Sequence, residues 1–331
     1  MRFKIVVQLF AIFIAPHLLS GTENPIDIPA LTIKSSGTER TCFVHLPKGF
    51  SSKKVYPLVF ILHGGGGNAL QVAGHSQFNK LADKYGFIVA YPQGINKHWN
   101  DGRKVPKHRE QDSTINDIEF IMKSIEAIKR KYPVNSSRIY AAGISNGGFM
   151  CQRLAVEKAN TFAAVASIVA SLPLRWQNSS PGEISVLLIN GTSDPLVPYN
   201  GGPLTIKILG IRLDQGKVLS TDKTIYFWLK HNKISTLPVI TDIEDKVPND
   251  NCHAVRFDWS NKESGVCVSL IKVINGGHSW PGAEKNLPKR IVGETCDDFN
   301  ASEVIWSFFK DKHLIVSPGR NKEIAQPHSV Q

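Results

Sequence analysis

The feature that most constrains this 331-residue chain is a serine set among glycines where an apolar stretch gives way to a helical one. Residues 140–150 read YAAGISNGGFM, with Ser145 between Gly143 and Gly147. RIYAA before the serine predicts a strand, and GGFMCQRLAVEKA after it predicts a helix. A nucleophile elbow is a tight turn of this kind, in which small residues relieve the crowding around a strained serine. We therefore interpret the stretch as an elbow, the alternative being an ordinary glycine-rich turn.

Short β-rich runs alternate along the chain with helix-periodic segments. This alternation predicts an α/β fold with a mostly parallel sheet covered by helices. Near-continuous apolar runs are typical of central parallel strands. We expect strands at residues 56–62, 86–91, 138–142, 162–169 and 184–189. With 42% hydrophobic residues, no repeat and no low-complexity linker, the chain should form a single domain.

Two helix starts have the spacing of a capping box. Thr114 and Asp117 precede an apolar helical face, and Asn300 and Glu303 precede VIWSFF. We expect the second helix to be the last one and to end near His313.

The glycines of HGGGG, residues 63–67, directly follow the apolar run at 56–62. An elbow serine needs backbone N–H donors for a developing oxyanion, and one of them is expected at this position. We assign Gly65 to this role, with Gly66 as the next choice, and interpret His63 as a loop-shaping residue. The helix that begins near Asn146 should direct a second N–H and its positive end to the same place. A phosphate-binding loop is the alternative, but no GK[ST] follows.

An acid and a histidine should follow the serine in that chain order. Asp194 comes after the apolar run SVLLIN and ends it in a turn, and His278 lies in SLIKVINGGHSWPG, after the last expected strand. Asp194 is therefore our candidate acid, and His278 our candidate base. The other late histidine, His313, suits the role of base less well because it belongs to the last helix. The other carboxylates considered lie before the serine or beyond the histidine: Asp112, Asp117, Asp297 and Asp298.

These segments resemble the esterase family of the polyhydroxybutyrate depolymerase type, a branch of the α/β-hydrolases that also contains feruloyl and acetyl xylan esterases. The resemblance covers about residues 40–313. It is carried by LHGGGGNA, YPQG, WNDGR, RIYAAGISNGGFM, NGTSDPLVPYNGG, GGHSWPG and FNASEVIWSFF.

The resemblance implies an α/β-hydrolase sheet with helices on both faces and hydrolysis of short or aromatic acyl esters without a cofactor or metal. It implies Ser145 as nucleophile, Asp194 as acid and His278 as base, with N–H donors from Asn146 and the Gly65 region. It also suggests Trp99 and Trp280 as pocket-lining residues, with simple packing as the alternative for both.

The sequence departs from the family pattern in three places. The Asp-Asp pair usual after WNDGR is Asn116-Asp117 here, residues 203–220 match no motif, and the chain has no Ser/Thr-rich linker with a separate polymer-binding domain. These departures weaken the case for polymer hydrolysis but leave ester hydrolysis intact. The alternatives are an acyltransferase or peptidase on the same fold and, from another class, a non-catalytic exported binding protein.

The N-terminal residues 1–20 have the pattern of a secretory signal, because Arg2 and Lys4 precede an apolar run. A bilayer span needs about 20 apolar residues, and Pro16 and His17 interrupt this run earlier. We expect a secreted or periplasmic catalytic domain at residues 21–315, followed by a flexible tail at 316–331. The net charge of +11 is spread over scattered lysines and not gathered on one basic face, so no nucleic-acid partner is expected.

Five cysteines are present without any CxxC pair, which argues against a zinc ribbon or a thioredoxin-type site. Up to two disulfides are possible, and the connectivity stays open. Cys252 and Cys267 flank an expected hairpin whose turn register should set Cys267 near Asp258. The full set is Cys42, Cys151, Cys252, Cys267 and Cys296.

Overall fold

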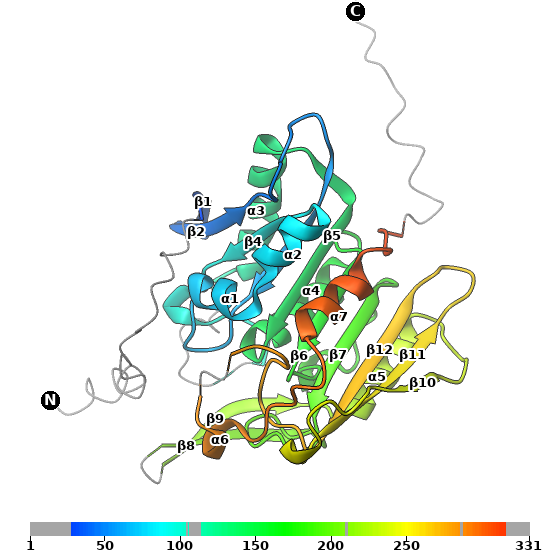
Figure 1. Cartoon of the computed structure of the whole chain (residues 1–331). Helices are drawn as coiled ribbons and strands as arrows, with labels where there is room; N and C mark the ends of the chain where they lie inside the picture. The colour runs from blue at the N-terminus through cyan, green and yellow to red at the C-terminus, as the bar shows by residue number, and fades with distance from the viewer. Residues whose placement is uncertain (1–27, 104, 106–113, 209–210, 285–286, 316–331) are drawn as a thin grey trace, which may run out of the picture.

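The computed structural model describes residues 28–103, 105, 114–208, 211–284 and 287–315. The expected leader at 1–20 and tail at 316–331 lie outside these described residues. A 10-stranded sheet forms the centre of the molecule, in the order β1-β2-β4-β3-β5-β6-β7-β12-β11-β10 (Figure 1). Its strands are β1 (Ala30–Ser35), β2 (Thr38–His45), β3 (Tyr56–Leu62), β4 (Ile88–Pro92), β5 (Val134–Ile144), β6 (Ala164–Ile168), β7 (Ser185–Gly191), β10 (Val239–Asp242), β11 (His253–Ser260) and β12 (Cys267–Ile274).

The neighbouring strands from β4 to β12 are all parallel, and antiparallel strands extend the sheet at both ends. Strands β3 and β7 are buried along their whole length, as expected of strands with helices above and below. The mostly parallel α/β architecture expected from the sequence is therefore confirmed.

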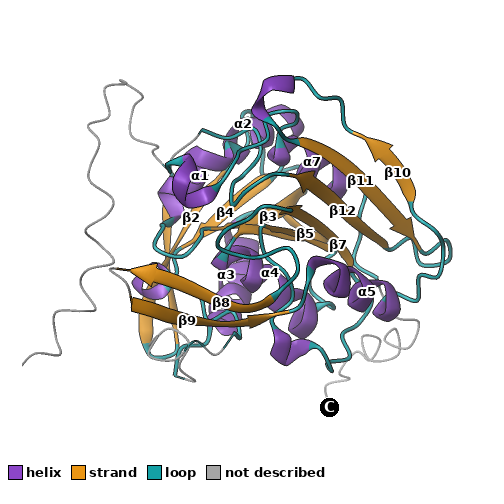
Figure 2. Cartoon of the chain, turned by 90° about the horizontal axis from the view of Figure 1, so that it is seen from below, coloured by secondary structure: helices purple, strands orange, loops and turns teal. Residues whose placement is uncertain are grey.

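Helices cover both faces of the sheet (Figure 2). Side chains from α1, α2 and α7 join the core on one face, and those from α3, α4 and α5 join the core on the other. The helices are α1 (Ala69–Ser76), α2 (Phe78–Tyr85), α3 (Asp117–Lys131), α4 (Asn146–Lys158), α5 (Thr221–His231), α6 (Lys289–Val292) and α7 (Ala301–Phe309). Among the described residues, no helix has both the length and the apolar character that crossing a bilayer requires.

Most expected strands are present, with shifted ends. The run at 56–62 is β3 without change, whereas β4 begins at Ile88 and β5 extends back to Val134. The turn between β11 and β12 pairs Cys267 with Ser260, so the expected position near Asp258 was wrong by two residues. Cys252 and Cys267 are nevertheless far apart along the hairpin, as expected.

The helix caps differ from the expectation at one start and one end. Asn116, not Thr114, caps α3, and its side chain accepts the Glu119 N–H at 3.0 Å. Helix α7 begins after Asn300 as expected but ends at Phe309 and not near His313. The chain leaves the helix there because its next carbonyls, at Lys310 and Lys312, accept hydrogen bonds from β5 side chains.

The stretch at 203–220, which matches no motif, forms a separate two-stranded antiparallel hairpin of β8 (Gly202–Ile208) and β9 (Ile211–Val218). Leu204 and Val218 of this hairpin belong to a small buried cluster with Phe149, which lies in the first turns of α4. The hairpin is therefore anchored beside the elbow helix.

Candidate active site

Ser145 occupies a backbone conformation that explains the glycines around it. Its φ of 55° and ψ of −118° are strained for a residue with a side chain. A Cβ on Gly143 would lie 2.5 Å from the Gly147 carbonyl oxygen, and one on Gly147 would collide with the Leu62 carbonyl oxygen. The Ser145 N–H donates to Ile168 O at 2.9 Å, which fixes the turn against β6. The strand-to-helix elbow is thus a feature of the structure.

The three residues assigned to a triad follow three parallel strands of the sheet. Ser145 follows β5, Asp194 follows β7 and His278 follows β12. The carboxyl ends of parallel strands lie along one edge, which is where such folds carry their sites. The sheet therefore gathers at one edge residues that are far apart along the chain.

Asp194 and His278 are in direct contact. The imidazole Nδ1 lies 2.7 Å from Asp194 Oδ2, and both side chains are nearly buried. The other carboxylate oxygen, Oδ1, accepts the N–H groups of Leu196 and Val197 at 2.8 Å each. The carboxylate is an acceptor, so the hydrogen-bond network assigns the imidazole proton to Nδ1 and leaves a lone pair on Nε2.

Within the described residues, no hydrogen bond joins Ser145 to His278. Bonds of this kind are often long in structures without substrate and shorten in the reacting complex.

The backbone at the end of α6 and in the segment that follows it holds the histidine loop in place. The His278 N–H donates to Val292 O at 2.5 Å, and the Gly277 N–H donates to Glu294 O at 2.7 Å. We call residues 292–296 the histidine strap, because the backbone carbonyls of this segment bind the N–H groups of the His278 loop and fix its position.

Two backbone N–H groups remain available beside the serine. In the described part of the chain, the N–H groups of Gly65 and Asn146 have no hydrogen-bond acceptor. A Cβ placed on Gly65 would lie 3.6 Å from the Asn146 Cβ, so the two residues are neighbours. Gly66, the second choice from the sequence, is unsuitable because its N–H already donates to Lys97 O at 2.9 Å.

A polar network that the sequence reasoning missed holds the Asn146 side chain. Its Nδ2 donates to Asp101 Oδ2 at 2.5 Å and to Trp99 O at 3.1 Å, and its Oδ1 accepts the Trp99 N–H at 2.7 Å. Asp101 also pairs with Arg103, which covers the Phe149 ring and donates to Gln215 O in β9. The motif WNDGR contains Asp101 and Arg103, but the motif alone does not predict which residues these two side chains contact.

The two tryptophans assigned to the pocket pack in the interior instead. Trp99 is fully buried and donates from Nε1 to His63 O at 2.9 Å, directly behind the glycine loop. Trp280 is 2% exposed, donates to Ser302 Oγ and packs against Phe78. The structure therefore favours the packing alternative for both residues.

His63 has the loop-shaping role predicted from the sequence. Its Nδ1 lies 2.8 Å from Gly64 O, and its Nε2 accepts the Gly94 N–H at 3.0 Å. Burial is the main cause that lowers the pKa of His63 to about 4, so the ring is neutral.

Two of the competing carboxylates have partners elsewhere, and Asp112 lies outside the described residues. Asp117 forms a buried ion pair with Arg40 at 2.6 Å. Asp298 accepts the backbone N–H groups of Lys246 and Val247. Among the described candidates, Asp194 is thus the one that contacts His278.

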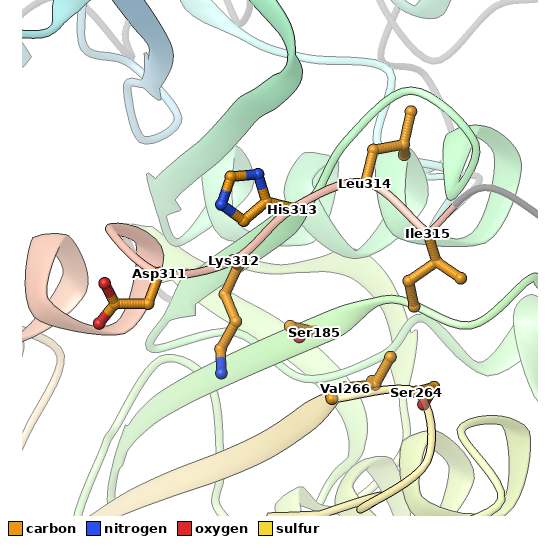
Figure 3. A pocket seen from close by; sticks show the side chains of 9 residues that line it. Ser185, Ser264, Val266, Asp311, Lys312, His313, Leu314 and Ile315 are labelled. Carbon is orange, nitrogen blue, oxygen red and sulfur yellow. The ribbon is translucent and has the colours of Figure 1, made fainter.

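Two cavities differ in their relation to this edge. One of about 310 Å³ lies by Ser185 and Val266, at the amino ends of β7 and β12 and so at the opposite edge from the serine (Figure 3). The other, of about 430 Å³, is bordered by Arg103, Arg175 and Lys217, on loops at the catalytic edge and on the β8–β9 hairpin.

Comparison with known proteins agrees with this geometry. Residues 41–197, which contain the glycine loop, the elbow and Asp194, match the family model described as esterase PHB depolymerase. Over these residues the chain is similar to this esterase family. It is 29% identical to "Putative esterase NocK" of Nocardia uniformis subsp. tsuyamanensis, over 76% of this chain and 73% of that protein. It is 30% identical to feruloyl esterase B of Piromyces equi, over 72% of this chain but only 42% of that longer protein.

A solved structure has a similar fold. Acetyl xylan esterase from Aspergillus awamori superposes with a TM-score of 0.51 at 16% identity, over 76% of this chain and 94% of the other. Together with the sheet order, this places the chain in the α/β-hydrolase fold.

Proposed function

We propose that this protein is an exported serine esterase in which Ser145, His278 and Asp194 act as a catalytic triad. The Ser145 hydroxyl attacks the ester carbonyl while His278 Nε2 takes its proton, and the alcohol leaves with that proton as the acyl-enzyme forms. Water then attacks the acyl-enzyme by the same route. The observation that carries the proposal is the 2.7 Å contact of His278 Nδ1 with a carboxylate whose second oxygen is held by two N–H groups.

The N–H groups of Gly65 and Asn146 form the oxyanion hole in this proposal. Both lack an acceptor in the described structure, so neither has to break a hydrogen bond before it donates to the substrate oxygen. The Asp101 network supports the hole because it fixes the side chain of Asn146, and with it the start of α4.

The substrates that suit the site are esters of short or aromatic acids. Relatives whose names are feruloyl esterase and acetylxylan esterase/xylanase support this class. The 430 Å³ cavity beside the β8–β9 hairpin offers space for the alcohol part of an oligomeric substrate. Export rests on the leader expected at residues 1–20.

The test is a variant series assayed with p-nitrophenyl acetate, methyl ferulate, acetylated xylan and hydroxybutyrate oligomers. Ser145→Ala should lower kcat/KM by at least about 10⁴-fold, and Asp194→Asn by about 10⁴-fold, because the amide favours the wrong imidazole tautomer. Asp245, which is exposed, offers a matched control, and Asp245→Asn should keep wild-type rates. Near-normal turnover of Asp194→Asn would mean that another carboxylate serves His278.

A further inference from the structure

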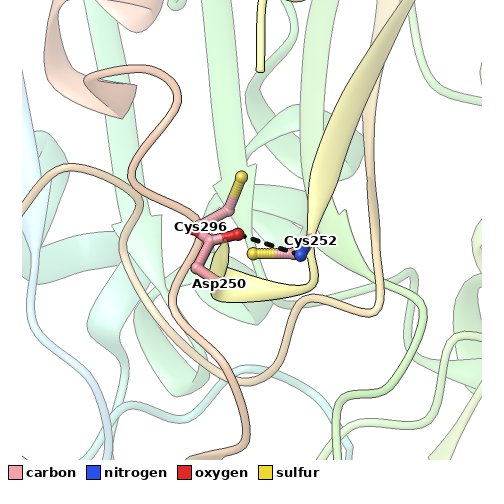
Figure 4. A group of neighbouring side chains, drawn as sticks. All are labelled: Asp250, Cys252 and Cys296. Atoms are coloured by element: carbon pink, nitrogen blue, oxygen red, sulfur yellow. Dashed lines mark hydrogen bonds between the residues drawn. The ribbon is translucent and has the colours of Figure 1, made fainter. Parts of the chain in front are cut away.

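Two cysteines from distant parts of the chain meet in one place. The Sγ atoms of Cys252 and Cys296 and a carboxylate oxygen of Asp250 all lie within 4.8 Å of one another (Figure 4). Cys252 immediately precedes β11, and Cys296 ends the histidine strap. Both are 2% exposed or less.

The backbone around these thiols is already held together. Asp298 is fully buried and accepts the N–H groups of Lys246 and Val247 at 3.0 and 3.4 Å, across the two segments. Asp250 accepts the Cys252 N–H at 2.9 Å and lies 3.5 Å from the Asp297 N–H. The two cysteines therefore lie in an ordered contact, with their sulfurs within 4.8 Å of each other. A disulfide would bring these sulfurs to about 2.0 Å.

The position of Cys296 connects this contact to the proposed site. Two and four residues before it, Glu294 and Val292 provide the carbonyls that hold Gly277 and His278. A bond that holds Cys296 at the start of β11 would therefore also hold the histidine strap in place.

We propose that Cys252 and Cys296 form a disulfide, and that this bond positions the histidine strap. The inference rests on the proposed function in one respect, since export takes the chain into an oxidising compartment. The reaction is thiol–disulfide exchange with a small or protein disulfide: one cysteine thiolate attacks the donor disulfide, and the second cysteine then displaces the donor. Two thiol protons and two electrons leave the protein, and the donor becomes two thiols.

The contact suits a disulfide better than a metal ion. Both carboxylates near the sulfurs are already acceptors for backbone N–H groups, so a metal would have to compete for them. Burial raises the pKa of the Cys296 thiol to about 12 and that of Cys252 further, so neither is a ready thiolate in the folded protein. The bond should therefore form during folding, before the pair is covered.

The other three cysteines lie apart from this pair. Cys42 and Cys151 are buried on the opposite face of the sheet, and Cys267 lies at the start of β12 with its Sγ 2.9 Å from Lys312 Nζ. One disulfide and three thiols are expected.

Disulfide mapping of the full chain, exported into an oxidising compartment, tests the pairing. The protein is denatured without reductant, alkylated with iodoacetamide and digested, and its peptides are identified by mass spectrometry. The expected result is alkylation of Cys42, Cys151 and Cys267, with the Cys252 and Cys296 peptides joined. Five alkylated cysteines, with or without a bound metal, would overturn the proposal, as would any other pairing. This readout does not depend on ester hydrolysis, so it fails or succeeds separately from the proposed function.

Kinetics test the positioning role. Dithiothreitol should lower the Tm of the wild type by about 5 °C. It should also shorten several-fold the half-life of enzymatic activity at elevated temperature. In steady-state assays, kcat should fall by a larger factor than KM rises. Cys252→Ser/Cys296→Ser should behave like the reduced protein with or without dithiothreitol. The control Cys267→Ser should keep the wild-type response. Equal half-lives with and without dithiothreitol in the wild type would contradict the positioning role.

Discussion

The elbow shows most clearly how single residues determine what the chain can do. Ser145 accepts a strained backbone because the residues two before and two after it have no side chain to collide with their neighbours. The hydrophobic core does not supply this tolerance, since it depends on a missing Cβ at two positions.

Gly147→Ala tests that dependence. The new methyl group would collide with the carbonyl oxygens of Leu62 and His63. These are backbone atoms at the end of the central strand β3, so they cannot move without disturbing the sheet. We expect a loss of about 3 kcal/mol or more in the free energy of unfolding, measured by urea denaturation. Gly182→Ala is the control, because its Cβ would be 3.4 Å from Ala159 and should change stability by less than about 0.5 kcal/mol. Equal stability of the two variants would show that the elbow is not strained as described.

His63 makes stability depend on pH. Its pKa is about 4 in the folded protein because burial disfavours the charged ring, against about 6.5 in the unfolded chain. The unfolded state binds more protons between these values, so this contribution is complete above pH 6.5 and is lost as the pH falls toward 4. In His63→Gln, the fall in unfolding free energy between pH 6.5 and 4 should be smaller than in the wild type by on the order of 3 kcal/mol. An unchanged slope in urea titrations from pH 4 to 7 would contradict this assignment.

At the scale of elements, the β8–β9 hairpin packs against the helix that begins after the serine. Its buried anchor, Leu204, packs with Phe149 of α4, while Arg103 ties β9 to the loop that holds Asn146. The hairpin is therefore coupled both to the elbow helix and to the loop that contacts Asn146.

Leu204→Ala should loosen this coupling. A buried leucine truncated to alanine costs about 2–5 kcal/mol, and a displaced hairpin should raise the KM for methyl ferulate more than it lowers kcat. Thermal unfolding and steady-state kinetics would measure both effects. Thr205→Ala, at an exposed neighbouring position, should leave them unchanged. A variant with lower Tm but wild-type KM would show that the hairpin does not border the substrate.

The predictability of the elements followed their burial. Strand β3 could be predicted to the residue because it is apolar along its whole length, whereas β8 and β9 could not, because they form their own small sheet and share no pattern with the central strands. The end of α7 was misplaced because tertiary hydrogen bonds to β5, and not local propensity, end the helix.

At the scale of the whole molecule, the sheet order converts sequence distance into proximity. Strands β5, β7 and β12 end at one edge, so the three residues that chain order selected, Ser145, Asp194 and His278, come to the same side of the sheet. The contacts between loops could not be predicted in this way. Neither the link from Asn146 to Asp101 nor the meeting of Cys252 with Cys296 has a local pattern, since each depends on how two loops lie after folding.

In the proposed mechanism a single serine carries the acyl group during turnover. Mass spectrometry of the protein mixed with p-nitrophenyl acetate and quenched in acid within the first turnovers tests it most directly. We expect one acetyl group per chain on the peptide that contains Ser145, formed in step with a burst of p-nitrophenol, and no adduct in Ser145→Ala. Full turnover without any adduct, or an adduct on another residue that persists in Ser145→Ala, would contradict the account.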